Sequence, residues 1–276
     1  MRLLFIGDIV GRPGRDLVRR HVRSLAAAYA ADLVIANGEN AAGGAGITRE
    51  NTLELLGAGI DVLTTGNHVW DKREALVFIA AEPRLIRPAN YPAGTPGAGS
   101  YVATTASGQV VGVINIMGRV FMAAIDDPFR VADREIARVR EAGARVIFVD
   151  MHAETTSEKM ALSWYLDGQV TAVVGTHTHV QTADERILPG GTACLTDAGM
   201  TGPHDGVIGM DRTAVIARFV SALPTRFEPA SGDARLHGVI VGADPLTGRA
   251  TSIERISLTE AALQAITAQA GAVAAP

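Results

Sequence analysis

Residues that can bind a metal follow the ends of five short apolar segments in this chain of 276 residues. The five polar groups are Gly7-Asp8, Asn37-Gly38-Glu39-Asn40, Gly66-Asn67-His68, Asp150-Met151-His152 and Gly175-Thr176-His177-Thr178-His179. Each preceding apolar segment is typical of a buried strand. Because ligands of open α/β sheets bind outside the carboxyl ends of the strands, the sequence predicts that these Asp, Glu, Asn and His side chains share one rim.

The residue types indicate which metals such a rim would hold. Imidazole together with carboxylate and carboxamide oxygens suits Mn, Fe or Zn better than Ca or a soft copper site. Glu39 is placed to bridge two cations, while His177 and His179 lie on a segment expected to be extended and can each bind a different one. Two cations about 3.5–4 Å apart clamp a phosphoryl group and lower the pKa of a shared water. The predicted dinuclear phosphoesterase centre has the ligands Asp8, Glu39, Asn40, Asn67, His152, His177 and His179.

The remaining histidines and the single cysteine are interpreted separately. His21 and His237 fall within regular elements and are expected in the core. His204 lies in a Gly-rich loop near the rim, so substrate contact and a plain loop position both stay open. Cys194, within an apolar strand, is expected to pack as a small hydrophobic residue.

Three arginines are candidates for contact with a substrate phosphate, which a guanidinium group recognises well. Arg12 and Arg15 follow the first polar group, and Arg119 lies in the motif INIMGRVFM. Solvated loop charges are an equal alternative for the first two. The segment 118–131 contains FMAAIDDPF, which as a plain surface loop would expose large apolar side chains. We therefore expect a contact in a homo-oligomer there, with a lid as the alternative.

Apolar runs predict strands and helical spacing predicts helices, and together they give the order of the elements that carry these groups. Strands are predicted at 2–6, 33–36, 61–65, 101–104, 110–116, 145–151, 171–175, 192–196, 213–220, 236–242 and 249–256. Helices are predicted at 15–30, 48–58, 71–80, 130–142, 157–167 and 259–270. This alternation suggests two stacked sheets flanked by helices. One domain is expected over 1–270, followed by a weakly ordered tail at 271–276.

Composition excludes several classes of function. The net charge of -4 argues against a wide basic face for duplex nucleic acid. A single cysteine allows no internal disulfide and suits a reducing compartment. No segment approaches the ~18 consecutive apolar residues of a membrane span. The stretch GDIVGRPGR matches neither a phosphate-binding loop nor a dinucleotide fold. We expect a cytoplasmic protein that binds neither duplex nucleic acid nor membrane.

The motifs resemble those of the calcineurin-like metallophosphoesterase superfamily, in which GD, GEN, GNH, a lone His after an apolar strand and GTHTH occur in this order. More specifically, the chain is similar to the bacterial YmdB-like family over residues 5–210. The similar stretches are FIGDIVGRPGR, ANGENAAGG, TTGNHVWDKRE, INIMGRVFM, GTHTHVQTADERILPGGTACLTDAGMTGP and DGVIGM. The resemblance implies an α/β fold, a four-layer sandwich of two stacked mixed β-sheets flanked by helices.

The resemblance also implies an activity, that of a 2',3'-cyclic-nucleotide 2'-phosphodiesterase with a di-iron or di-manganese centre, yielding 3'-nucleotides. The implied ligands are Asp8, Glu39, Asn40 and His179 for the first metal, and Glu39, Asn67, His152 and His177 for the second. A metal-bridged hydroxide would attack phosphorus, and His68 would act as the general acid that protonates the departing ribose oxygen. The wider superfamily usually has a His where this chain has Val10. The YmdB-like relatives share this difference, and Asn40 would fill the gap.

Other functions stay open at this point. A phosphomonoesterase or nucleotidase could use the same two metals. A non-catalytic regulatory protein could hold a nucleotide through its metals, although it would have no need of His68. An RNA-binding protein would require a basic stripe that the sequence lacks.

Overall fold

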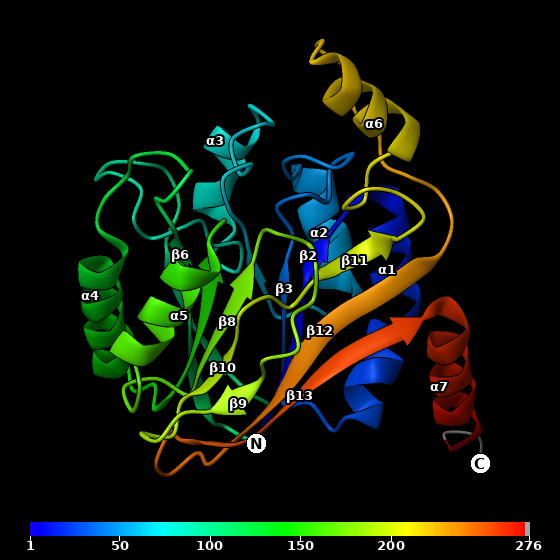
Figure 1. Cartoon of the computed structure of the whole chain (residues 1–276). Coiled ribbons are helices and arrows are strands. Elements are labelled where there is room, and N and C mark those ends of the chain that lie inside the picture. The colour runs from blue at the N-terminus through cyan, green and yellow to red at the C-terminus, as the bar shows by residue number, and fades with distance from the viewer. Residues whose placement is uncertain (274–276) are drawn as a thin grey trace.

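The computed structural model describes residues 1–273 and shows two β-sheets packed face to face, with helices on both outer faces (Figure 1). Both sheets contain parallel and antiparallel strand pairs. The expected α/β four-layer sandwich is therefore confirmed.

The first sheet is built around the amino-terminal strand. Its order is β2-β11-β12-β1-β3-β4, and β13 pairs with β12. The strands are β1 (Arg2–Ile6), β2 (Asp8–Ile9), β3 (Leu33–Asn37), β4 (Val62–Thr64), β11 (Met200–Pro203), β12 (Ala234–Ala243) and β13 (Ala250–Thr259). Because β1, β3 and β4 run parallel, their carboxyl ends open on the same side.

The second sheet has the order β5-β6-β7-β8-β10-β9. Its strands are β5 (Ser100–Thr104), β6 (Val110–Met117), β7 (Val146–His152), β8 (Ala172–Thr176), β9 (Arg186–Ile187) and β10 (Ala193–Leu195). The strands predicted at 101–104 and 110–116 are confirmed as β5 and β6, which pair antiparallel. The parallel run β6, β7 and β8 again sends three carboxyl ends to one side.

Helices cover the outer face of each sheet (Figure 1). On the first sheet lie α1 (Gly11–Ala28), α2 (Arg49–Ala58) and α7 (Glu260–Val273). On the second lie α4 (Pro128–Glu141) and α5 (Thr156–Tyr165). Thr48 begins α2 by accepting a hydrogen bond from the Asn51 amide at 3.1 Å, as the sequence predicted for a helix opened by this residue.

The strand β1 packs against both the helices and the second sheet. Leu4 and Ile6 belong to the apolar cluster under the helices, whereas Leu3 and Phe5 belong to the cluster between the sheets. Alternate residues of a strand point to opposite faces, which explains why the whole run is apolar. The rings of Phe5 and Phe148 lie 4.9 Å apart across the two sheets. Burial of each such side chain contributes roughly 1.5–3 kcal/mol.

The prediction of a strand at 213–220 is wrong, because these residues form the helix α6 (Arg212–Ser221). The side chain of Asp211 accepts a hydrogen bond from the Ala214 amide at 3.0 Å and caps this helix. The run TAVIARFV is rich in residues that favour strands, but α6 stands away from both sheets (Figure 1). A helix satisfies its backbone groups within its own segment and therefore needs no strand beside it.

Smaller differences from the predictions occur elsewhere. The helix predicted at 71–80 is reduced to α3 (Ala75–Phe78) and the 3-10 turn η1 (Ile79–Ala81). The short strands β2, β9 and β11 carry too few residues to be seen as a pattern. The predicted tail begins within α7, which continues to Val273, and residues 274–276 lie outside the described residues.

The segment 118–131 is a loop followed by the first turns of α4. Phe121 is 89% exposed and has a φ of 60°, while Phe129 is half-buried against Tyr165. A role in an oligomer contact or a lid stays a prediction. Within residues 1–273, helices long and apolar enough to cross a bilayer are not found.

Candidate metal centre

The predicted metal ligands lie at one rim, where the carboxyl ends of strands from both sheets meet. The first sheet and its loops supply Asp8, Glu39, Asn40 and Asn67, and the second supplies His152, His177 and His179. Contacts across the two sheets are direct, since the Nε2 atom of His152 lies 3.2 Å from the Oε1 atom of Glu39. The site therefore depends on how the two sheets are packed together.

One group of donors surrounds His152 at the end of β7. Its Nε2 atom lies 2.9 Å from the Oδ1 atom of Asn67. One potential ligand atom each from Glu39, His152 and His177 lies within 4.8 Å of the others, so these three residues could hold a metal ion. Glu39 and His152 are fully buried, and a cation there would be largely removed from bulk water.

A second group of donors lies on the other side of Glu39. The Nε2 atom of His179 is 3.1 Å from the Asn40 amide nitrogen and 3.9 Å from the Oδ1 atom of Asp8. The same Asn40 nitrogen lies 3.1 Å from the Oε1 atom of Glu39. Glu39 is thus in contact with both groups, which is the arrangement that a shared ligand requires.

The prediction that His177 and His179 lie on an extended segment is wrong. β8 ends at Thr176, and the two histidines have φ values of 99° and 64°, which places them in a tight turn. The Nε2 atom of His177 lies 3.0 Å from a carboxylate oxygen of Glu154, whereas His179 faces Asp8. The turn, rather than strand alternation, directs the two rings to different donor groups.

The buried acids of the site have shifted pKa values. Burial raises the pKa of Asp8 to about 6, against the lowering effect of His179 and His152. Burial also acts to raise the pKa of Glu39, but the charge and hydrogen bond of His152 outweigh it and lower that pKa to about 2. Glu39 therefore stays negatively charged at neutral pH, as a ligand shared by two cations must.

The two imidazoles beside Glu39 shift in opposite directions. Burial opposes the charged form of His152, but the carboxylate of Glu39 outweighs it and raises the pKa to about 9. Burial and the neighbouring His152 lower the pKa of His177 to about 3. Because a ligating histidine must be neutral, a metal ion has to compete with the proton on His152, whereas His177 is already neutral at pH 7.

Polar residues behind His152, which the sequence placed in the polar groups but not among the ligands, fix the orientation of its ring. The Nδ1 atom of His152 lies 2.9 Å from the Thr176 hydroxyl, which donates to the buried Asp150 at 2.6 Å. Asn37 donates to the other carboxylate oxygen of Asp150 at 3.0 Å. Such outer partners orient a metal-binding imidazole. An acid within the apolar run RVIFVDM was the available sequence signal.

The residues proposed to contact substrate lie in different surroundings. Arg12 is largely exposed beside Asp16, and Arg119 lies 3.2 Å from Asp127. Arg15 donates to the Ala41 carbonyl and to Glu54, so it supports the loop that carries Glu39 and Asn40. His204 lines a cavity of about 300 Å³ together with His179 and His237. The substrate roles of these four residues stay predictions.

His68 lies beside the donor groups but is oriented differently from the predicted ligands. Its backbone amide donates to the Oε2 atom of Glu39 at 3.2 Å. Its ring is 39% exposed, and the Nδ1 atom lies 2.8 Å from a carboxylate oxygen of Asp71. The Nε2 atom is left for a group that approaches from solvent. This geometry suits a proton donor held in place by Asp71.

Two observations indicate that the rim fits metal ions. The Oδ1 atom of Asp8 is buried and, among the described residues, has no hydrogen-bond partner, which is costly unless a cation satisfies it. His179 directs its Nδ1 atom to the Ile208 carbonyl at 2.9 Å, which leaves the lone pair on Nε2, the atom that lies beside Asn40 and Asp8. The mixed nitrogen and oxygen donors suit borderline metals such as Mn, Fe or Zn.

Gly66 provides a test of this fit. A Cβ atom there would lie 2.2 Å from the His152 Nε2 atom and 2.3 Å from the Glu39 Oε2 atom, so Gly66→Ala must displace both donors. We expect the metal affinity, measured by calorimetric titration, to fall by at least the ~10–100-fold that loss of an outer partner causes, because here two predicted ligands are displaced. Gly57→Ala is the control, because its Cβ atom would meet nothing within 4 Å. Unchanged affinity in Gly66→Ala would contradict the assigned geometry.

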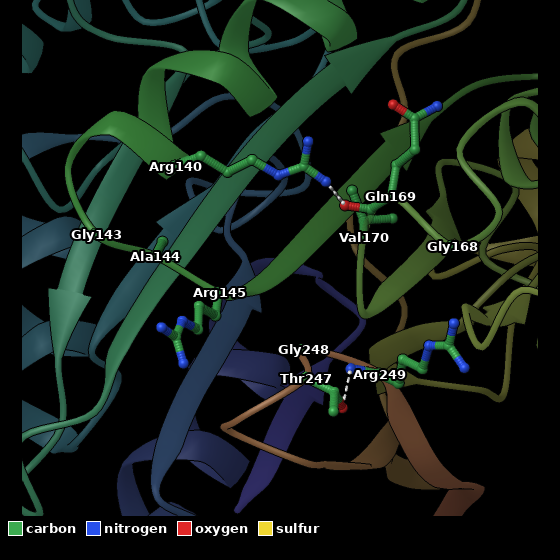
Figure 2. Close-up of a pocket in the computed structure, with 10 residues that line it drawn as sticks. All are labelled: Arg140, Gly143, Ala144, Arg145, Gly168, Gln169, Val170, Thr247, Gly248 and Arg249. Carbon is green, nitrogen blue, oxygen red and sulfur yellow. Dashed lines mark hydrogen bonds between the residues drawn. The ribbon is translucent and has the colours of Figure 1, made fainter.

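A larger cavity lies elsewhere, at the amino ends of β7 and β8 (Figure 2). It has a volume of about 460 Å³ and is lined by Arg140, Arg145 and Arg249 among others. Arg140 donates to the Gln169 carbonyl at 2.6 Å, and Figure 2 shows the other two guanidinium groups extending away from each other. The candidate site is therefore identified by the potential ligand atoms that meet at the rim, and not by the size of a cavity.

A two-sheet sandwich with nitrogen and oxygen donors gathered at its rim defines the class of the metallophosphoesterases. The sequence profile of the family described as YmdB-like protein matches residues 4–256. The chain belongs to the YmdB-like family. This bears out the resemblance drawn from the motifs.

Known proteins of this kind are similar over nearly their whole length. The chain is 54% identical over 263 residues to the 2',3'-cyclic-nucleotide 2'-phosphodiesterase of Bacillus subtilis (strain 168). This alignment covers 94% of this chain and 98% of the relative. A crystal structure of a hypothetical protein from Thermus thermophilus has a TM-score of 0.88 at 43% identity, covering 94% of this chain and 100% of the other. A crystal structure described as a novel phosphatase, from Mycoplasma pneumoniae, has a TM-score of 0.87 at 34% identity, covering 94% and 93%.

Proposed function

We propose that this enzyme hydrolyses the 2'-ester bond of 2',3'-cyclic nucleotides at a dinuclear metal centre and releases 3'-nucleotides. The assignment as a phosphodiesterase rests on membership of the YmdB-like family and on 54% identity to a relative named as a phosphodiesterase. The choice of substrate is supported by the name of that relative. The position of Glu39, in contact with donors on both sides, is the observation that carries the dinuclear centre.

The chain's own residues supply the remaining parts of the reaction. Bound cations would neutralise phosphate charge and lower the pKa of a water. Asp8, Asn40 and His179 would hold one cation, Asn67, His152 and His177 the other, and Glu39 would be shared. His68, oriented by Asp71, would donate a proton from its Nε2 atom to the departing ribose oxygen. Charge neutralisation and proton donation together favour cleavage of a stable diester.

The proposed function is tested by combining elemental analysis with a substrate panel on the wild-type protein. We expect two metal ions per chain and hydrolysis of 2',3'-cyclic nucleotides to 3'-nucleotides. Chelation should abolish both, and Mn or Fe should restore them. Product position is read by comparing retention with 2'- and 3'-nucleotide standards. A chelated protein that remains fully active would overturn the metal-dependent mechanism.

A phosphomonoesterase is the second candidate, because the related Mycoplasma pneumoniae structure is described as a phosphatase. Nucleoside monophosphates in the same panel separate the two activities. Faster release of inorganic phosphate from a monophosphate than ring opening of the cyclic diester would favour this candidate. Iron or manganese as the native metal, a homo-oligomeric state and a cytoplasmic location stay predictions from the sequence.

A further inference from the structure

A buried ion pair lies directly behind the turn that carries His177 and His179. The Nζ atom of Lys159, in the first turns of α5, donates to the Oδ2 atom of Asp197 at 2.7 Å. Lys159 is 2% exposed and Asp197 is fully buried. The chain has only two lysines among its 25 basic residues. A buried ion pair is by itself weak evidence for stability, so the neighbours of this pair must show what it does.

Asp197 holds the residue between the two metal-binding histidines. Its Oδ2 atom accepts hydrogen bonds from the backbone amide of Thr178 at 3.2 Å and from the Thr178 hydroxyl at 2.6 Å. Its Oδ1 atom accepts one from the Gly199 amide at 2.8 Å. His177 and His179, on either side of Thr178, both have positive φ values. Such conformations persist only where the surroundings hold them firmly, and Asp197 supplies that restraint.

The space around Lys159 explains why this position holds a lysine. A Cβ atom on Gly175 would lie 2.8 Å from the Lys159 Cδ atom and 1.7 Å from the Thr196 carbonyl oxygen. The lysine stem therefore passes close against β8, where the following segment also approaches. A compact ammonium group on an unbranched stem fits this space, whereas a planar guanidinium group is broader.

We propose that Lys159 and Asp197 are positioning residues that hold the Thr178 turn, so that His177 and His179 face their separate metal ions. The ammonium group offsets the charge of Asp197, and the charged carboxylate is the strong acceptor that fixes Thr178. The proposal rests on the proposed function only for the presence of metal ions. Its test measures metal affinity without any substrate.

The adjacent residue of α5 provides a matched comparison. Glu158 is also buried, but its carboxylate accepts the backbone amides of Arg119 and Val120 at 3.0 to 3.3 Å. It therefore supports a different loop. A change at Glu158 perturbs the same helical turn and also alters a buried charge, while leaving the Thr178 turn in place.

The experiment titrates Mn²⁺ into chelator-treated protein by calorimetry. In Thr178→Val, which loses only the hydroxyl donor, the Kd should rise by about tenfold, and in Lys159→Met by about 10–100-fold, the range typical of outer partners of metal ligands. Thr178→Ser should bind like the wild type, because it keeps the hydroxyl. Glu158→Gln should also keep the wild-type Kd. The melting temperature of each chelator-treated variant shows that it is folded.

The outcomes separate this inference from the proposed function. Wild-type affinity in both Thr178→Val and folded Lys159→Met would overturn the inference alone. An equal loss in Glu158→Gln would also overturn it, since the effect would then come from α5 in general. If Lys159→Met does not fold, the comparison of Thr178→Val with Thr178→Ser decides. A wild-type protein that binds no Mn²⁺ would overturn both the inference and the dinuclear centre.

Discussion

Replacement of Glu39 by glutamine is expected to remove bound metal and to lower turnover of a 2',3'-cyclic nucleotide by about a thousandfold or more. The side chain keeps its size but loses the charge that both donor groups share. Metal ions contribute several kcal/mol to stabilising charge in a transition state, and every 1.36 kcal/mol corresponds to about tenfold in rate. Elemental analysis and initial rates on the same preparation measure the two effects together.

The control for this variant is Glu260→Gln. Glu260 also forms an ion pair, 2.6 Å from Arg20, but both side chains of this pair are exposed on the surface. It should keep wild-type metal content and rate, because exposed ion pairs contribute about 0–1 kcal/mol. Two metal ions per chain in Glu39→Gln would refute the shared-ligand role of Glu39.

Replacement of His68 by alanine is expected to lower turnover by about 10²–10⁴-fold, the usual contribution of a general acid. Metal content should stay at the wild-type value, since the contact from residue 68 to Glu39 is made by the backbone amide and survives the substitution. Loss of rate without loss of metal would separate His68 from the predicted ligands. Elemental analysis and kcat on a 2',3'-cyclic nucleotide provide the measurement.

The leaving group supplies the control for His68. A nitrophenolate ion departs without a proton, so His68→Ala should lose much less activity on bis(p-nitrophenyl) phosphate than on a cyclic nucleotide. Asp71→Asn should show an intermediate loss on the cyclic nucleotide, because Asp71 orients the ring through the Nδ1 atom. An equal loss on both substrates would assign His68 to binding rather than to proton donation.

The common rim of the donor residues was predictable because it follows from strand order and direction. Glu39 and His152 come after apolar runs, and parallel strands bring their carboxyl ends to the same side. The pairing of the two sheets was harder to derive, since Phe5 and Phe148, which meet across the sheets, are far apart in the sequence. The alternation of strands and helices suggested two stacked sheets, and the resemblance to a known family implied the same arrangement.

Contacts between distant segments explain what the sequence did not reveal. The run at 213–220 has strand composition, but its state depends on having a strand beside it, and α6 has none among the described residues. The roles of Asp150 and Asp197 depend on Thr176 and Thr178, which local patterns cannot pair with them. The positive φ values of His177 and His179 occur on either side of Thr178, which Asp197 contacts from a later segment.

The predicted ligands are divided between the two sheets, so bound metal ions would link the two halves of the molecule. Among the predicted ligands, the carboxylates come from the first sheet and the imidazoles from the second, so a chain whose sheets have separated would lose its metal ions. Anything that binds the folded state alone stabilises it by mass action. With the proposed centre, depletion of metal would therefore lower the stability of the sandwich where its two sheets meet.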